Sequence, residues 1–137
     1  MPKEVKYIEA LKRVESRLAE ERASELWAEA EGMLVSGEEI QRQAASDLMI
    51  EACELSPTEK RLITLTQESI ELDYVERVVP LLVIQHKSAE LNLEYMWALV
   101  QSHEALKQLS EAKTYADLIL SLDPSEPRAL RFKKRYH

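Results

Sequence analysis

Three consecutive residues, Ser102, His103 and Glu104, have the side-chain types of a hydrolase triad. In such a triad the imidazole lies between the hydroxyl and the carboxylate and transfers a proton. The surrounding residues predict a helix, on which consecutive side chains point in different directions. The three groups therefore cannot form a relay with one another.

Other motifs that carry chemistry are missing from the sequence. It has no His-x-x-x-His or Cys-x-x-Cys pair and no carboxylate cluster that suggests a metal site. Two separated glycines cannot build a phosphate-binding loop. Glu54 follows Cys53 and disfavours a thiolate there, so we interpret Cys53 as a small core residue. We expect no catalysis, no metal and no cofactor.

The net charge of −7 is unevenly distributed. Residues 126–137 contain five Lys or Arg and one Glu, a local charge of +4, so the remainder carries −11. An acidic chain is repelled by nucleic acid and by anionic membranes. Phe132 and Tyr136 are interleaved with the basic residues, a pattern that can contact RNA, but the segment is short. A nucleic-acid partner is therefore a minor alternative, and a membrane partner is not expected.

Cysteine usage and hydropathy favour a cytoplasmic protein. The single cysteine permits no internal disulfide, which suits a reducing compartment. The apolar run over residues 78–84 is far too short to span a membrane. Residues 1–17 lack the apolar core of a signal peptide.

The elements that position these residues are predicted to be helices throughout. Good helix formers dominate, and only two glycines and five prolines interrupt them. Residues 3–22 carry an apolar stripe of Tyr7, Leu11, Val14 and Leu18, and a second apolar phase follows it. Whether residues 3–35 form one helix or two stays open. Further helices are expected over residues 38–57, 58–73, 73–90, 91–109, 110–123 and 127–136, which makes the fold class all-α.

Several residues are predicted to begin, end or bend these helices. Gly37 is expected as the C-cap of the first segment, and Thr58 and Ser110 as N-caps. Pro80 is expected to kink the helix over residues 73–90 or to mark an early turn in it.

Two of the helices end in the same way, at Leu55-Ser56-Pro57 and at Leu122-Asp123-Pro124. The two prolines are 67 residues apart, close to two periods of about 34, which is the length of a tetratricopeptide repeat. Ala45 and Ala112, twelve residues before each proline, occupy the small-residue position of the repeat. Over about residues 23–137 the chain resembles the tetratricopeptide repeat family.

The resemblance is uneven along the chain. The last hairpin is the clearest match, although Ala116 and Ile119 depart from the preferred residues, and His103 falls at a packing position and is expected to be buried. The middle hairpin lacks the proline expected near residues 87–89. An unrelated helical bundle with Leu-Asp-Pro helix stops is the alternative.

The resemblance implies antiparallel helical hairpins stacked as a short right-handed superhelix. Residues 1–22 would then be an extra helix that caps the repeats. Alternatively, its stripe pairs with another copy, giving a homodimer through residues 3–22. The last segment ends at Tyr136-His137 without an obvious cap, as in a domain excised from a longer protein.

The family's layout directs the second, fifth and ninth residues of each first helix into a concave groove. The resemblance therefore implies a partner-binding set with Trp97 as an aromatic anchor beside three arginines, suited to an acidic peptide or a C-terminal segment of another protein. The alternative is that Trp97 packs in the core and the arginines are a solvated face. The set comprises Glu94, Trp97 and Gln101 in one helix, Arg128, Arg131 and Arg135 in the last, and Glu59, Leu62 and Thr66 in the middle hairpin.

We therefore expect a non-catalytic adaptor or chaperone-like module. The alternative is a structural or oligomerising domain of a larger complex. The Lys and Asn clamp of chaperone-binding relatives is broken at Ala98 and Phe132, which disfavours binding of a chaperone tail.

Overall fold

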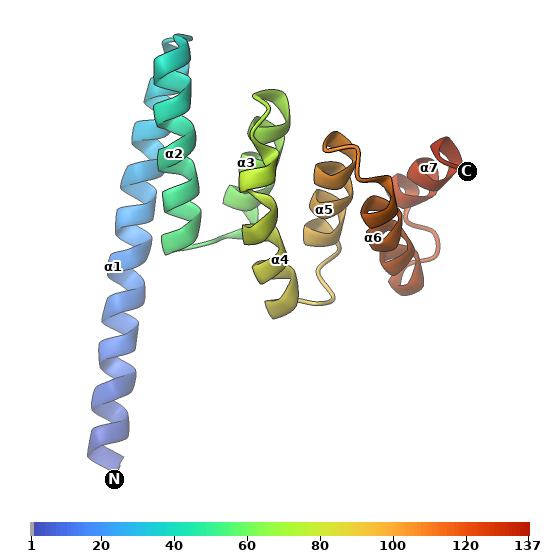
Figure 1. The fold of residues 1–137 in the computed structure, drawn as a ribbon. Coiled ribbons are helices and arrows are strands. Elements are labelled where there is room, and N and C mark those ends of the chain that lie inside the picture. Colours follow the sequence, from blue (N-terminus) through green and yellow to red (C-terminus); the bar gives the residue numbers. More distant parts are fainter. Residues whose placement is uncertain (1) are drawn as a thin grey trace. The chain divides into compact units, whose positions relative to one another are not determined.

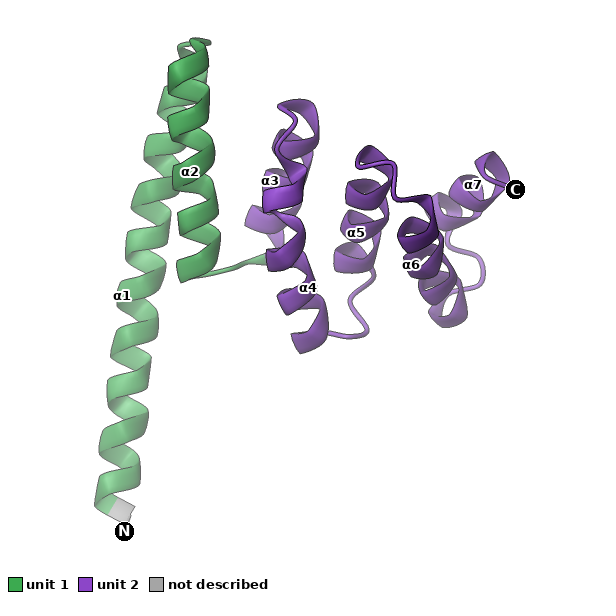
Figure 2. Ribbon diagram, in the orientation of Figure 1, with its two compact units in different colours: residues 1–58 green, residues 59–137 purple. Residues whose placement is uncertain are grey.

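The computed structural model describes residues 2–137, with side chains from residue 3 onward. This described part contains helices and no strand, which confirms the all-α fold class. The chain divides into two compact units, residues 1–58 (unit 1) and residues 59–137 (unit 2) (Figure 2).

Unit 1 is a hairpin of two helices of unequal length, α1 (Pro2–Val35) and α2 (Glu39–Leu55) (Figure 1). α1 is one continuous helix, which answers the question that the apolar pattern left open. Fully buried small residues let the two helices approach closely, among them Ala23 and Ala30 on α1 and Ala52 on α2.

The turn of this hairpin contains Gly37, which ends α1 as predicted. Its φ of +73° lies in the region where a side chain is strained, so glycine is favoured there. The Gly37 N–H donates to the Leu34 carbonyl at 3.3 Å, and the Arg42 side chain donates to the Gly37 carbonyl.

The first half of α1 has no helix of unit 1 beside it. α2 ends near Glu20, whose carboxylate accepts a hydrogen bond from Ser56, and α1 runs on past that point (Figure 1). Residues 3–18 are all exposed, so the predicted stripe forms an apolar surface. Its members are Tyr7, Leu11, Val14 and Leu18, with exposed fractions of 70%, 46%, 42% and 55%.

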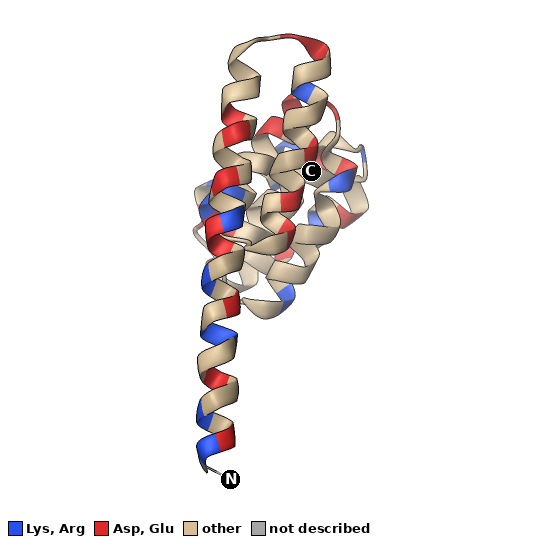
Figure 3. Cartoon of the chain, turned by 90° about the vertical axis from the view of Figure 1, so that its left-hand side faces the viewer, with Lys and Arg blue, Asp and Glu red and all other residues tan. Residues whose placement is uncertain are grey.

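Charge also changes along α1 (Figure 3). Residues 3–17 contain five Lys or Arg and three Glu, whereas residues 18–35 contain one Arg and five Glu. The exposed half of the helix is therefore basic, and the half that packs against α2 is acidic.

Unit 2 contains five α-helices and one short 3₁₀ helix among its residues (Figure 1). The fully buried Phe132 joins the last helix to a core with Met96 and Ile119. Ala112 and Ala116 are also fully buried in this core. They are small residues one turn apart in the sequence of the helix over residues 109–122. The elements are α3 (Glu59–Glu71), η1 (Val75–Arg77), α4 (Val79–Ser88), α5 (Leu93–Ala105), α6 (Leu109–Leu122) and α7 (Pro127–Arg135).

The helix predicted over residues 73–90 is replaced by the 3₁₀ turn η1 followed by α4. Pro80 lies in the first turn of α4, where its missing N–H removes no helical hydrogen bond. Of the two expectations for Pro80, the early turn is therefore right.

The expected N-cap at Ser110 is wrong, because α6 already begins at Leu109. Lys107 adopts a positive φ of 60°, and the Gln108 N–H donates to the His103 carbonyl at 2.8 Å. With this short link the N-cap position falls at Gln108, two residues before Ser110.

Replacing Phe132 by Ala should destabilise unit 2 by about 3–5 kcal/mol, because it opens a cavity in a fully buried site. Leu130→Ala on the same helix is the matched control, since Leu130 is 47% exposed and should cost about 1 kcal/mol or less. Urea unfolding followed by Trp97 fluorescence in a Trp27→Phe background reports on this unit. Equal losses in the two variants would contradict the packing described.

Candidate functional site

Two polar contacts in unit 2 join residues that are 34 positions apart. Gln67 Nε2 on α3 donates to Gln101 Oε1 on α5 at 3.0 Å. The Arg128 guanidinium on α7 donates two hydrogen bonds to the Glu94 carboxylate on α5, each 2.9 Å long. α3 and α5 are therefore joined at the same sequence interval as α5 and α7.

Two of the three groove residues expected in the middle hairpin are buried in the structure. Leu62 and Thr66 are fully buried, and the Thr66 hydroxyl donates to the Leu62 carbonyl at 2.7 Å. They cannot line a groove. The α3 residues that lie 34 positions before Glu94, Trp97 and Gln101 are Lys60, Ile63 and Gln67, one position further along than expected.

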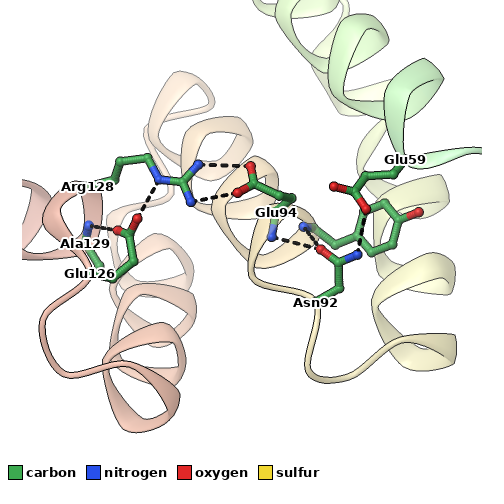
Figure 4. A network of polar contacts seen from close by, with 7 residues as sticks. Glu59, Asn92, Glu94, Glu126, Arg128 and Ala129 are labelled. Atoms are coloured by element: carbon green, nitrogen blue, oxygen red, sulfur yellow. Dashed lines mark hydrogen bonds and ion pairs between the residues drawn. The ribbon is translucent and has the colours of Figure 1, made fainter.

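Arg128 is the centre of a polar network between α5 and the start of α7 (Figure 4). Its Nε donates to Glu126 at 2.7 Å, in addition to the paired hydrogen bonds to Glu94. Glu126 is the N-cap of α7, and its second oxygen accepts from the Ala129 N–H at 2.9 Å. The network therefore orients the guanidinium and the first turn of α7 together.

A second N-cap lies beside this network. Asn92 Oδ1 accepts hydrogen bonds from the Glu94 and Tyr95 N–H groups at the start of α5, at 2.9 and 3.3 Å. Its Nδ2 donates to the Glu59 carboxylate on α3 at 3.0 Å (Figure 4). Asn92 thereby fixes the start of α5 and joins it to α3.

The network shifts the pKa of each of its ionisable groups. The hydrogen bonds from Arg128 lower the pKa of Glu94. Burial by itself raises the pKa of Glu126, but the hydrogen bonds from Ala129 and Arg128 outweigh burial and lower it. The hydrogen bonds to Glu94, with a contribution from Glu126, raise the pKa of Arg128. All three groups are therefore charged at neutral pH.

A pocket of about 540 Å³ opens beside the network, between α5 and α7. The Arg128 guanidinium lies over the Trp97 ring, with its carbon 5.4 Å from the ring centroid, in cation–π range. Trp97 is half-buried, so it is neither a core residue nor a fully solvated one. The lining residues are Trp97, Arg128, Arg131, Lys134 and Arg135.

The cations of this pocket differ in how far they are neutralised. Arg128 pairs with two carboxylates, and Arg135 pairs with Glu104 at 3.1 Å. Arg131 and Lys134 are exposed, and neither forms an ion pair with any described residue. The pocket therefore contains two positive charges that have no counter-charge within the described chain.

The structure brings together four of the six partner-binding residues predicted on α5 and α7, namely Trp97, Arg128, Arg131 and Arg135. The other two do not line the pocket: Glu94 binds Arg128, and Gln101 binds Gln67. Sequence reasoning missed Lys134, because the groove positions taken from the family exclude it. The available signal was its spacing of one helical turn from Arg131.

Ser102, His103 and Glu104 each have a different hydrogen-bond partner, as expected for consecutive residues of a helix. The Ser102 hydroxyl donates to the Ala98 carbonyl at 2.7 Å. His103 is buried, and its Nδ1 contacts Gln108 Oε1 at 2.7 Å. Glu104 binds Arg135. No two of the three are partners in these hydrogen bonds.

The described residues contain neither a metal-ion cluster nor a membrane-spanning helix. They contain no group of three His, Cys, Asp or Glu side chains placed to hold a metal ion. None of their helices combines the length and the apolar character needed to cross a membrane. Cys53 is buried, in agreement with its interpretation as a core residue.

No family model matches this sequence, and no solved structure matches the chain significantly. The resemblance to tetratricopeptide repeats therefore stays a prediction.

Replacing Glu94 by Gln should lower the stability of unit 2 by about 1 kcal/mol at pH 7, because it removes the charge from a paired, partly exposed interaction. A carboxyl with a lowered pKa stabilises the fold above its unfolded pKa, near pH 4, and this contribution is lost as the pH falls through the lower folded value. The difference between wild type and Glu94→Gln should therefore shrink below about pH 4.

Urea unfolding between pH 7 and pH 3 tests this dependence. Glu90→Gln is the matched control, since Glu90 is exposed and makes no polar contact with a described residue. A difference between wild type and Glu94→Gln that stays constant over this range would refute the assigned role of the Glu94 charge.

Proposed function

We propose that unit 2 is a non-catalytic protein-interaction module, adaptor or chaperone-like, that binds an acidic peptide or C-terminal segment of a partner. The pocket beside Trp97 carries the proposal, because it combines an aromatic wall with four cations, two of them unpaired. Trp and Arg are the residues that most often dominate the binding energy of interfaces.

The repeat spacing supports a tetratricopeptide-like architecture for this module. The Gln67–Gln101 and Glu94–Arg128 contacts both join positions one repeat length apart. In such an architecture Ile63, Trp97 and Arg131 would be equivalent residues, at positions that such modules direct toward partners.

The charge distribution favours an acidic partner. Unit 2 as a whole is almost neutral, with 11 Lys or Arg and 12 Asp or Glu, so its positive field is local to α7. A local patch of this sign attracts acidic segments and repels basic ones during encounter. Binding should therefore weaken as salt concentration rises.

Reversing the unpaired charges with Arg131→Glu/Lys134→Glu should abolish capture of partners, while Lys87→Glu/Lys113→Glu, elsewhere on unit 2, should retain it. A photo-crosslinking amino acid at Trp97 should label an acidic segment of the captured protein. Affinity capture followed by mass spectrometry measures both outcomes. If the folded pocket variant retains every partner of wild type, the pocket is not the binding site.

A second candidate function, oligomerisation, is favoured by the exposed stripe on α1. Four large apolar side chains at near-heptad spacing, all more than 40% exposed, form the pattern of a helix that pairs with another. Burial of such a stripe against a second copy would remove it from water.

Leu11→Glu should then convert a dimer to a monomer without unfolding unit 1, because the substitution places a charge in the paired stripe. Ser16→Glu adds the same charge outside the stripe and should leave the dimer intact. Sedimentation equilibrium of the full chain measures the mass. A wild-type chain that stays monomeric throughout would exclude this function.

A further inference from the structure

The two unpaired cations of the pocket lie on one face of α7. Arg131 and Lys134 are three residues apart, a spacing that brings side chains on a helix within about 5–6 Å of each other at their Cβ atoms. Both line the pocket beside Trp97. A single anionic group placed there can contact both side chains at once.

The flanking arginines are held in place by the protein itself. Arg128 uses Nε and one N–H on each terminal nitrogen for Glu126 and Glu94, which leaves two of its five N–H donors for a ligand. Arg135 donates to Glu104 through one nitrogen. These arginines therefore supply oriented donors, whereas the excess charge of the pocket comes from Arg131 and Lys134.

Two adjacent unpaired positive charges match one dianion better than one monoanion. A carboxylate carries a single charge and would leave one cation uncompensated. A phosphate monoester carries about −1.5 to −2 at pH 7 and offers three strong acceptor oxygens. Its oxygens can accept the forked pair of an Arg and the point charge of a Lys together.

We propose that the pocket binds a phosphate monoester on a segment of a partner protein, with Arg131 and Lys134 neutralising the dianion and Trp97 contacting the attached carbon skeleton. This proposal rests on the proposed function and names the acidic group that it requires. The volume of about 540 Å³ is ample for a phosphorylated side chain.

Trp97 provides the signal for a direct test. The chain has two tryptophans, so Trp27→Phe leaves Trp97 as the only one in a full-length protein. Three small probes share a phenyl ring: phenyl phosphate and the dicarboxylate phenylmalonate are both dianions near pH 7, and phenylacetate is a monoanion. Saturable quenching of Trp97 should give phenyl phosphate at least about tenfold tighter binding than phenylacetate, as expected for the loss of one charge-assisted contact. Phenyl phosphate should also bind more tightly than phenylmalonate, whose acceptor oxygens are divided between two carboxylates.

Variants assign the binding to the two cations. Arg131→Gln and Lys134→Gln should each weaken phenyl phosphate binding about tenfold, since each removes one charge-assisted contact. Lys87→Gln removes an exposed charge of unit 2 outside the pocket and should leave the dissociation constant unchanged. Equal weakening by all three variants would overturn the assignment to this pocket.

The source of the phosphate is tested with a degenerate phosphoserine peptide pool, the same pool after phosphatase treatment, and vesicles that contain phosphatidate. The proposal expects retention of the phosphorylated pool alone. Retention of the vesicles instead would overturn a protein source.

The two proposals fail in different ways. If phenylmalonate binds as tightly as phenyl phosphate, the phosphate proposal is overturned, whereas the acidic-segment function stands. If no probe and no peptide pool binds, both are overturned.

Discussion

The hydrogen bonds of Arg128 determine the geometry of unit 2 beside the pocket that Trp97 lines. Glu126 is almost fully buried, and a buried carboxylate is tolerated only when its charge is paired and hydrogen-bonded. Arg128 supplies that pairing, and it also spans to Glu94 and covers Trp97. One side chain thus links the N-cap of α7, the start of α5 and the aromatic wall of the pocket. The cost of leaving Glu126 unpaired keeps these three parts in one arrangement.

This arrangement divides the basic residues of α7 by role. Arg128 and Arg135 are neutralised by glutamates of α5, so they contribute shape and directed N–H groups. Lys133 pairs with Asp117 on α6 at 2.6 Å, which joins the outer side of α7 to its neighbour. Arg131 and Lys134 are exposed and form no ion pair with a described residue. A cluster that looks uniform in sequence therefore contains both paired and unpaired cations.

Local physics made much of this structure predictable. Helix propensity and the prolines after Ser56 and Asp123 placed most helix ends within a few residues, and α5 and α7 carry four of the residues that were expected to bind a partner. The phase of α3 was not predictable, because Leu62 and Ile63 are both apolar and only packing decides which is buried. The partners of Glu94 and Gln101 lie 34 residues away, and a single sequence does not reveal such pairs.

The exposed half of α1 has a consequence for the lifetime of the chain. Residues 3–18 extend for about 24 Å as helix without a neighbouring helix in unit 1. An isolated helix of this length is marginal in water, so its backbone opens far more readily than that of the α1/α2 contact. Lys12, Arg13 and Arg17 lie within it and are cleavage points for trypsin-like proteases. Limited proteolysis would therefore trim this segment first and leave the buried hairpin intact.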